Sequence, residues 1–271
     1  MASSHRNWIF GVSDFSTTEP LQNAEEIIAC GLDFVEPGLA KAAAMSRPDF
    51  DLAADRLKAA GIRVQSMNWF LPPHLKIVGP DINHTECRQF LEQAFGRADY
   101  LNASAIVFGS PGSRSIPAGF SEARAREQII AFCHLAADLI SEAQYGLKIA
   151  VEHVNHTETN HLNTFAQALD VVREVDRPEI GLAADFYHFA MENEDPEVML
   201  EAGDLIHAVQ LANPDGRCFP QVGANIPGID RFFEHLSAID YQGGVSVEAS
   251  VTQGLTKDCK SAADFFAAIC R

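Results

Sequence analysis

Residues 146–186, GLKIAVEHVNHTETNHLNTFAQALDVVREVDRPEIGLAADF, contain the pattern that decides the fold. Two short apolar runs, 148–153 and 181–185, are rich in β-forming residues, and each carries a carboxylate at or next to its end. Between them, residues 163–175 have apolar side chains at helical spacing, and Asn163–Thr164 is typical of a helix start. This stretch therefore predicts a strand, a helix and a second, parallel strand.

The same alternation extends over the rest of the chain. Strands are predicted at 8–12, 34–36, 64–67, 105–108, 148–153, 181–185, 207–211 and 244–248. Helices are predicted at 21–30, 50–60, 86–101, 122–145, 163–175, 196–202, 229–239 and 261–270. Asp195–Pro196 is typical of a helix start, and Gly31, Gly61, Gly146 and Gly203 follow predicted helices, where a left-handed cap favours glycine.

Eight strands that alternate with eight helices predict an α/β protein with an all-parallel sheet. In 271 residues with right-handed crossovers, a closed (β/α)8 TIM barrel is the economical arrangement, so we expect a single TIM-barrel domain over residues 1–271. The competing arrangement is an open doubly wound sheet, which usually has a Gly-rich turn after its first strand. Here that turn reads SDFSTTEP (residues 13–20) and lacks glycine, which favours the barrel.

The composition restricts the partners. There are 37 acidic and 20 basic side chains, a formal net charge of −17, which argues against nucleic acid and against an anionic membrane surface as partners. No apolar run reaches signal-peptide length at the N-terminus or the ~20 residues that span a bilayer. We expect a cytoplasmic protein whose six cysteines, none in a CxxC pair, are reduced.

In a barrel, the active site is built at the carboxyl ends of the strands. The polar residues at or just after these ends are Ser13, Asp14, Glu36, Asn68, Ser110, Glu152, His153, Asp185, His188, Gln210, Asn213 and Glu248. A single such carboxylate is commonly a solvated loop charge. Glu152, Asp185 and Glu248, however, all lie within apolar runs, and like charges in one low-dielectric site repel unless some are protonated or a cation neutralises them. The three together predict a metal site.

Motifs in this order at strand ends resemble the sugar isomerase/epimerase superfamily with the xylose isomerase-like TIM barrel. The resemblance is nearest to ketose 3-epimerases of the D-tagatose/D-psicose type and to hydroxypyruvate isomerase-like proteins, and it covers most of the chain. It is carried by FVEPG (34–38), MNWFLP (67–72), FGSPGSRSIP (108–117), VEHVNHTETNHLNT (151–164), ADFYHFAMENED (184–195), HAVQLANPDGRCFP (207–220) and YQGGVSVEAS (241–250).

The resemblance implies one divalent metal ion. Glu152, Asp185 and Glu248 match three of the family's ligands, and Gln210 occupies the position of the fourth, which is His in most members. His207 lies three residues earlier, on the opposite face of the strand, and is no substitute. Three carboxylates and an amide oxygen form a hard donor set that favours Mn²⁺ or Mg²⁺ over Zn²⁺. The alternative for Gln210 is an amide that only hydrogen-bonds a neighbouring side chain.

The resemblance also implies proton transfer beside a carbonyl through a metal-bound enediolate. Glu152 and Glu248 match the two catalytic glutamates, and Glu158, His188 and Arg217 match substrate-binding positions. Asn68 and Trp69 are expected to line the substrate pocket, where an indole face suits the apolar side of a sugar; packing at the rim is the alternative. Glu36 resembles a family position near the site, without an assigned step. For His153, which alternates away from Glu152, a structural role is expected.

These features predict an enzyme, a metal-dependent isomerase or epimerase of a free ketose or keto sugar acid, and the resemblance implies a homo-oligomer. Epimerisation requires one glutamate on each face of the substrate, whereas aldose–ketose isomerisation requires one carboxylate to move the proton between neighbouring carbons. An inosose-type dehydratase and a non-catalytic sugar-binding barrel are the alternatives, the latter because of Gln210. A DNA-repair endonuclease is disfavoured by the acidic charge and by the few His residues at strand ends.

Overall fold

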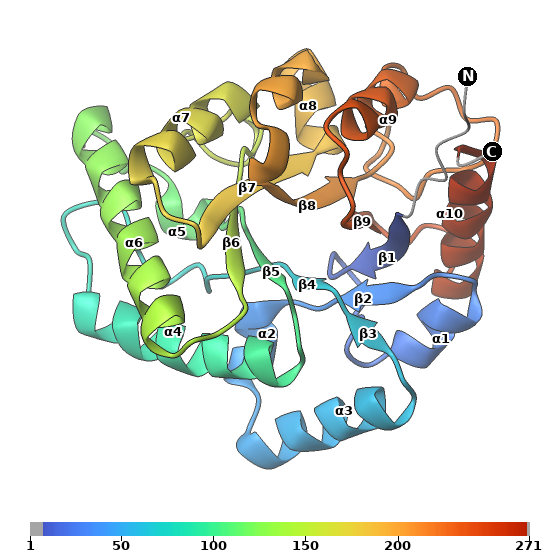
Figure 1. Cartoon of the computed structure of the whole chain (residues 1–271), viewed down its shortest axis with the longest axis horizontal. Coiled ribbons are helices and arrows are strands. Elements are labelled where there is room, and N and C mark those ends of the chain that lie inside the picture. The colour runs from blue at the N-terminus through green and yellow to red at the C-terminus, as the bar shows by residue number, and fades with distance from the viewer. Residues whose placement is uncertain (1–7, 270–271) are drawn as a thin grey trace.

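The computed structural model describes residues 8–269, and its centre is a parallel sheet that curls into a barrel (Figure 1). The strands follow one another in the order β3-β2-β1-β9-β8-β7-β6-β5-β4, and neighbouring strands pair in parallel. Their bounds are β1 (Ile9–Ser13), β2 (Phe34–Glu36), β3 (Arg63–Val64), β4 (Ser66–Met67), β5 (Ala105–Phe108), β6 (Lys148–Glu152), β7 (Ile180–Asp185), β8 (Ile206–Leu211) and β9 (Gly244–Val247). The predicted TIM barrel is confirmed.

The predicted strand 64–67 is in two pieces, β3 and β4, which are separated by Gln65. β3 pairs with β2, whereas β4 pairs with β5. The prediction of one continuous strand was therefore wrong, because Gln65 moves the chain from one ladder to the other. The continuous chain at this residue joins the two edges and leaves the barrel nearly closed.

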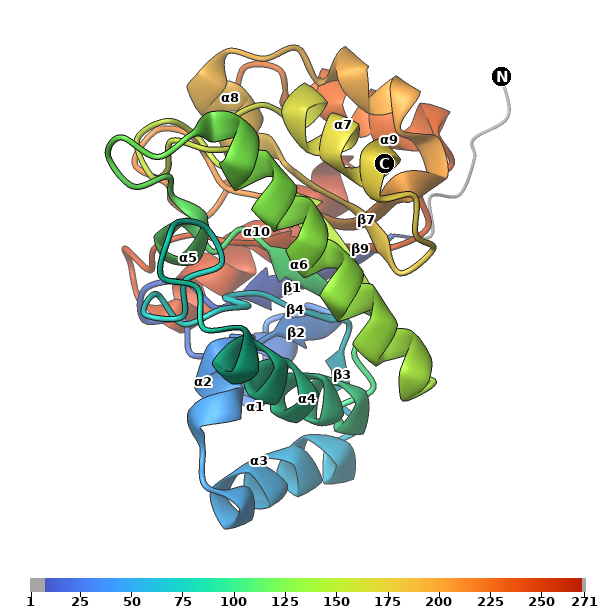
Figure 2. The same cartoon turned by 90° about the vertical axis from the view of Figure 1, so that its left-hand side faces the viewer.

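Helices cover the outside of the barrel, and seven of them correspond to predicted helices. These are α1 (Ala24–Ala29), α3 (Arg47–Ala59), α4 (His84–Tyr100), α6 (Glu122–Glu142), α7 (Phe165–Val175), α9 (Ile229–Ala238) and α10 (Leu255–Ile269). Figure 2 shows α7, α6 and α4 succeeding one another along one side of the barrel. Thr164 begins α7 with a capping box that it forms with Gln167, as the predicted helix start requires.

Several predictions of local structure need correction. Residues 196–202 were predicted as an α-helix but form a 3-10 helix, η1 (Pro196–Glu201), followed by η2 (Gly203–Leu205). Three short helices, α2 (Leu39–Ala44), α5 (Pro111–Arg114) and α8 (Phe186–Glu192), follow β2, β5 and β7 and were not predicted, because helices of four to seven residues are too short to show a helical repeat.

The predicted left-handed caps are confirmed at Gly31, Gly61 and Gly203, whose φ angles are 97°, 65° and 54°. The prediction was wrong at Gly146, because α6 ends earlier than expected and Gln144, with a φ of 56°, takes the left-handed conformation. The last helix begins at Leu255 rather than at 261, and its predicted end at Cys270 lies outside the described residues.

Two cores result from the alternation of side chains along the strands. The larger one lies between the sheet and the helices, and a small separate cluster consists of short side chains: Val107, Ala150, Ala183 and Ala208. The three alanines stand two positions before Glu152, Asp185 and Gln210, so they share a strand face with these polar residues. A layer of small side chains therefore lies next to the polar strand ends within the barrel.

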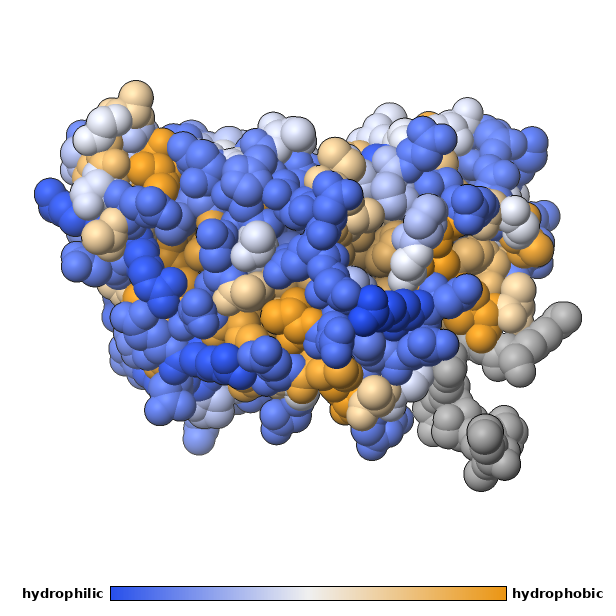
Figure 3. Space-filling model, turned by 90° about the horizontal axis from the view of Figure 1, so that it is seen from above, coloured by the Kyte–Doolittle hydropathy of each residue, from blue (hydrophilic) through white to orange (hydrophobic). Residues whose placement is uncertain are grey.

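The surface seen from above is mainly hydrophilic, with small apolar patches between charged and polar groups (Figure 3). This matches helices that turn their apolar stripes to the sheet and their polar faces outward. Among residues 8–269, no helix combines the length and the apolar character needed to cross a bilayer. The five cysteines in this range are free thiols.

A cluster of phenylalanines anchors the loop that follows β4. Phe70 is fully buried and contacts Phe95 of α4, Phe108 of β5 and Phe132 of α6, with ring centroids 5.6–5.9 Å apart. We predict that Phe70→Ala lowers the free energy of unfolding by about 3–5 kcal/mol, because it leaves a cavity. Urea unfolding at an unchanged m-value measures this loss.

The matched control is Leu52→Ala on α3, where the side chain is 74% exposed, with an expected change within about 0.5 kcal/mol. Equal losses in the two variants would contradict the anchoring role of Phe70.

Candidate active site

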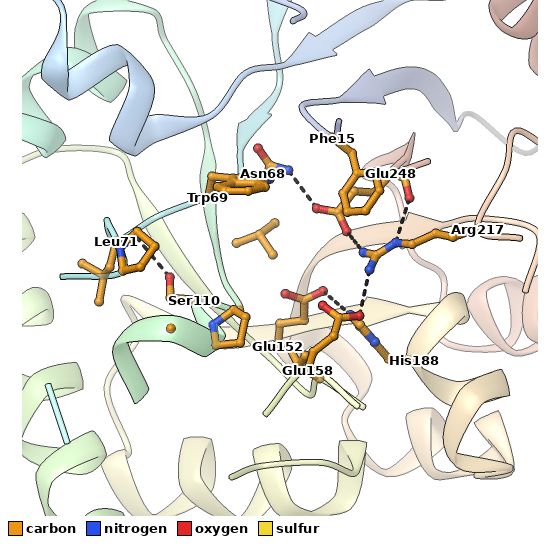
Figure 4. A pocket seen from close by; sticks show the side chains of 16 residues that line it. Phe15, Asn68, Trp69, Leu71, Ser110, Glu152, Glu158, His188, Arg217 and Glu248 are labelled. Carbon is orange, nitrogen blue, oxygen red and sulfur yellow. Dashed lines mark hydrogen bonds and ion pairs between the residues drawn. The ribbon is translucent and has the colours of Figure 1, made fainter. Parts of the chain in front are cut away.

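The strand register brings the predicted polar residues to one end of the barrel. Asp185 pairs in register with Gln210, and Gln210 pairs with Ser246, two residues before Glu248. A cavity of about 320 Å³ lies at this end. Predicted residues that line it, Asn68, Trp69, Glu152, Glu158, His188, Arg217 and Glu248, are shown in Figure 4.

Glu152, Asp185 and His188 form the most compact group at this end. One nitrogen or oxygen atom from each lies within 4.8 Å of the others, and all three residues are buried. The Nε2 atom of His188 is 3.5 Å from Oε1 of Glu152 and 3.5 Å from Oδ2 of Asp185. Asp185 also begins α8, because its Oδ1 accepts a hydrogen bond from the Tyr187 amide.

The carboxyl groups of Glu152, Asp185 and Glu248 are hard to ionise when no cation is bound. Burial raises the pKa of Glu152 well above its ordinary value, and the charges of Glu248 and Asp185 raise it further. Burial and the charge of Glu248 raise the pKa of Asp185 to about 7. Burial also raises the pKa of Glu248, although Arg217 opposes this shift.

Glu248 is held by two donors from other loops. Its carboxylate accepts a hydrogen bond from Nδ2 of Asn68 at 2.9 Å. It also forms an ion pair with Nη2 of Arg217. The other end of the same guanidinium binds Oε1 of Glu158 at 2.8 Å. The carboxylates of Glu158 and Glu248 are thus linked by one arginine, as Figure 4 shows.

Two aromatic rings hold Arg217 in this position. The guanidinium carbon lies 4.1 Å from the ring centroid of Phe15 and 4.4 Å from that of Tyr187. Such contacts stabilise a cation and also restrict its rotamers. Phe15 and Tyr187 were not predicted as site residues, because their role depends on a contact between distant loops.

Asn155 decides which nitrogen of His188 carries the proton. The Asn155 Oδ1 accepts a hydrogen bond from the Thr157 amide, so its Nδ2 must be the atom that lies 2.8 Å from Nδ1 of His188. Nδ1 therefore accepts, and the neutral imidazole carries its proton on Nε2. Burial lowers the pKa of His188 well below its ordinary value, so the neutral form is favoured. In this form Nε2 has no lone pair for a metal, and its N–H faces the two carboxylate oxygens at 3.5 Å without forming a hydrogen bond to either.

Four buried oxygen atoms at this end have no hydrogen-bond partner among the described residues. They are Asn68 Oδ1, Glu152 Oε1, Asp185 Oδ2 and Gln210 Oε1. A buried acceptor without a donor is costly, and a hard divalent cation is the partner that carboxylate and amide oxygens prefer. Glu152, Asp185 and Gln210 thus fit a metal through these oxygens. Glu248, the remaining member of the predicted ligand set, lies beside them.

Other predicted residues lie at the rim or outside. Trp69 lines the cavity with a φ of 46° and is 44% exposed. His153 is fully buried and packs against Phe165 and Phe189, which confirms its structural role.

Sequence reasoning missed two further residues next to Glu152. Arg114 is fully buried and donates hydrogen bonds to the backbone carbonyls of Phe108 and Glu152, so it ties β5 to β6. Gly109 approaches so closely that a Cβ atom there would overlap the Glu152 carboxylate. Both residues belong to the motif FGSPGSRSIP, but no property of the motif alone points to Glu152.

Comparisons with known proteins place the chain in a family. The family model of the xylose isomerase-like TIM barrel matches residues 24–269. A ketose 3-epimerase of Arthrobacter globiformis is 32% identical over 105 residues, and an inosose isomerase of Bacillus subtilis is 40% identical over 115 residues. These matches cover 38% of this chain and only 35% and 40% of the two relatives.

A solved structure extends the likeness over the whole fold. The D-allulose 3-epimerase from Methylomonas sp., in complex with D-allulose, superposes with a TM-score of 0.80 at 23% identity and covers 99% of each chain. Since the family model matches most of the chain, the protein belongs to the xylose isomerase-like TIM barrel family.

Proposed function

We propose that this protein is a divalent-metal-dependent epimerase or isomerase that moves a proton next to the carbonyl of a free ketose or keto sugar acid. The observation that carries the proposal is the set of unpartnered oxygens of Glu152, Asp185 and Gln210 beside Glu248 at the end of the barrel. The matched relatives, a ketose 3-epimerase and an inosose isomerase, support the same class of reaction.

The donor set favours Mn²⁺ or Mg²⁺ over Zn²⁺. The proposed ligands, Glu152, Asp185, Gln210 and Glu248, offer oxygen atoms alone, and the tautomer of His188 removes the nearby nitrogen as a ligand. When bound, the cation polarises the substrate carbonyl and offsets the negative charge that develops as the proton leaves.

The two glutamates perform the proton transfer. Glu152 projects from β6 and Glu248 follows β9, and both line the cavity from different sides (Figure 4). One carboxylate removes the carbon-bound proton and the other returns a proton on the opposite face, which is epimerisation. Burial raises the pKa of both carboxyl groups in the metal-free protein, and a bound cation would lower these pKa values again, so that both groups are ionised and able to accept a proton.

The neighbouring side chains bind and orient the substrate. The Nε2–H of His188 and the guanidinium of Arg217 are donors for substrate oxygens, and Glu158 is an acceptor for a hydroxyl group. Arg217 needs no further ordering when substrate enters, because Phe15 and Tyr187 already hold it. Trp69 and Leu71 add an apolar wall that suits the C–H face of a sugar.

The charge around the cavity favours a substrate without phosphate. Arg217 is the one cationic side chain among the described residues that line the cavity, and two carboxylates already neutralise it. A phosphate group normally requires a basic cluster or a nest of backbone amides. A free sugar or sugar acid is therefore the favoured substrate class.

The reaction is tested by hydrogen exchange. The protein is incubated in D₂O with Mn²⁺ or Mg²⁺ and a panel of ketoses, keto sugar acids, hydroxypyruvate and an inosose, and deuterium is located by NMR. We expect deuterium at a carbon beside the carbonyl, with Glu152→Gln and Glu248→Gln slowing exchange by at least about 100-fold. Glu201→Gln at the surface is the control, since its side chain is 65% exposed. Absence of exchange with every compound would contradict the proposal, and loss of water from the inosose would indicate a dehydratase.

The space beside Glu152 gives a second prediction. Gly109→Ala places a methyl group where the Glu152 carboxylate lies, so we expect exchange to slow by about 10-fold to 100-fold while the protein stays folded. Gly146→Ala is the matched control, because its added Cβ meets no atom within 4 Å. Equal exchange rates in both variants would show that Glu152 does not need this position.

The buried charge gives a third prediction. Because the pKa of Asp185 is raised to about 7 in the folded protein, its contribution to stability is present below about pH 4 and is lost as pH rises through 7. In EDTA at pH 8, Asp185→Asn should therefore melt above wild type by about 2 °C or more, and this gain should shrink at pH 5. Asparagine keeps the oxygen that caps α8. Thermal unfolding measures the difference, and identical melting curves at pH 8 would rule out a buried charge at this position.

A further inference from the structure

Glu36 is a buried carboxylate at this end of the barrel that the proposed reaction does not use. It ends β2, and only 1% of its surface is exposed. Its Oε1 accepts hydrogen bonds from Nε2 of Gln210 at 2.7 Å and from Oγ of Ser246 at 3.0 Å. Its Oε2 accepts a hydrogen bond from the hydroxyl group of Ser66. A carboxylate with this many donors is held in one position.

The contacts of Gln210 account for both hydrogens of its amide. Nε2 donates to Glu36 at 2.7 Å and lies 3.3 Å from Oγ of Ser13, which takes the second N–H. Oε1 of Gln210 is buried and has no donor among the described residues. Gln210 pairs in register with Asp185, whose Oδ2 also lacks a donor. The amide thus presents its nitrogen to Glu36 and leaves its oxygen for another partner.

We propose that Glu36 is a positioning residue that orients the amide of Gln210, so that the oxygen and not the nitrogen faces the divalent cation. This inference rests on the proposed function, because it assumes the metal site. A carboxylate accepts hydrogen bonds but does not donate them, so it attracts the NH₂ group and repels the carbonyl oxygen of the amide.

The physical need for such a residue follows from the difference between an amide and an imidazole. The ligating nitrogen of a histidine is selected by the hydrogen bond at its other nitrogen. The two ends of a glutamine amide have almost the same shape, but the NH₂ end presents partially positive hydrogens and no available lone pair, so it cannot bind a cation. A buried acceptor behind Gln210 prevents the wrong orientation, since a flipped amide would bring its oxygen against the Glu36 carboxylate.

Two substitutions of Glu36 separate orientation from charge. Glu36→Asp keeps the charge but shortens the side chain by one methylene, so it withdraws the acceptor from Gln210. Glu36→Gln removes the charge but keeps an acceptor oxygen at the same reach for Gln210 and Ser246, with the Ser66 hydroxyl group near its NH₂ group. We expect Glu36→Asp to weaken Mn²⁺ binding by about 10-fold to 100-fold and Glu36→Gln to retain most of the wild-type affinity. A purely electrostatic role predicts the opposite order.

Calorimetric titration of the metal-free protein with Mn²⁺ measures these affinities, and thermal unfolding in EDTA verifies that each variant is folded. Ser66→Ala is the matched control, because it removes a hydrogen bond to Glu36 without touching Gln210, and its Kd should change by less than about 3-fold. In a Gln210→Ala background, Glu36→Asp should weaken Mn²⁺ binding no further, because Glu36 acts through Gln210.

The outcomes distinguish this inference from the proposed function. Wild-type affinity in folded Glu36→Asp, or a larger loss in Glu36→Gln than in Glu36→Asp, overturns the positioning role and leaves the metal site intact. Unchanged binding in Gln210→Ala removes Gln210 as a ligand, and with it the inference alone. Absence of Mn²⁺ binding to the wild-type protein overturns both.

Discussion

The mutual repulsion of three buried carboxylates is the constraint on which the rest of this active site depends. Glu152, Asp185 and Glu248 lie at or next to the ends of three barrel strands, and burial raises the pKa of each. The charge of Glu248 raises the pKa of Glu152 and of Asp185 further. Such an arrangement is unfavourable for the folded protein alone and favourable once a divalent cation is bound. At the proposed metal site, a divalent cation would offset this repulsion and stabilise the folded chain.

The surrounding contacts hold this unfavourable arrangement in place. Arg217 neutralises Glu158 and Glu248 from one side, and it is itself fixed between Phe15 and Tyr187. The three side chains that the proposed function assigns to substrate or catalysis, Glu158, Arg217 and Glu248, are thereby ordered in the structure without a ligand. Groups that need no reorganisation stabilise developing charge most effectively, so this order would serve the proposed proton transfer beside a carbonyl.

Behind the carboxylates, the backbone is fixed by Arg114. Its guanidinium donates hydrogen bonds to two strand-end carbonyls, those of Phe108 and Glu152. The position of Glu152 at the end of β6 therefore depends on an arginine that does not line the cavity. The small side chains of Ala150, Ala183 and Ala208 stand two positions before the proposed ligands. Because side chains alternate along a strand, these alanines share the ligands' face and leave room around them.

The sequence by itself determined the barrel and its strand-end carboxylates. Both are periodic or local properties: apolar runs of strand length alternate with helical spacing, and each of Glu152, Asp185 and Glu248 stands inside an apolar run. The tertiary structure decided what depends on contacts between distant loops. The break at Gln65, the proton on Nε2 of His188, the aromatic contacts of Arg217 and the orientation of the Gln210 amide all belong to this second group. Each depends on a hydrogen-bond or packing partner from another segment of the barrel, and spacing along the chain does not specify such partners.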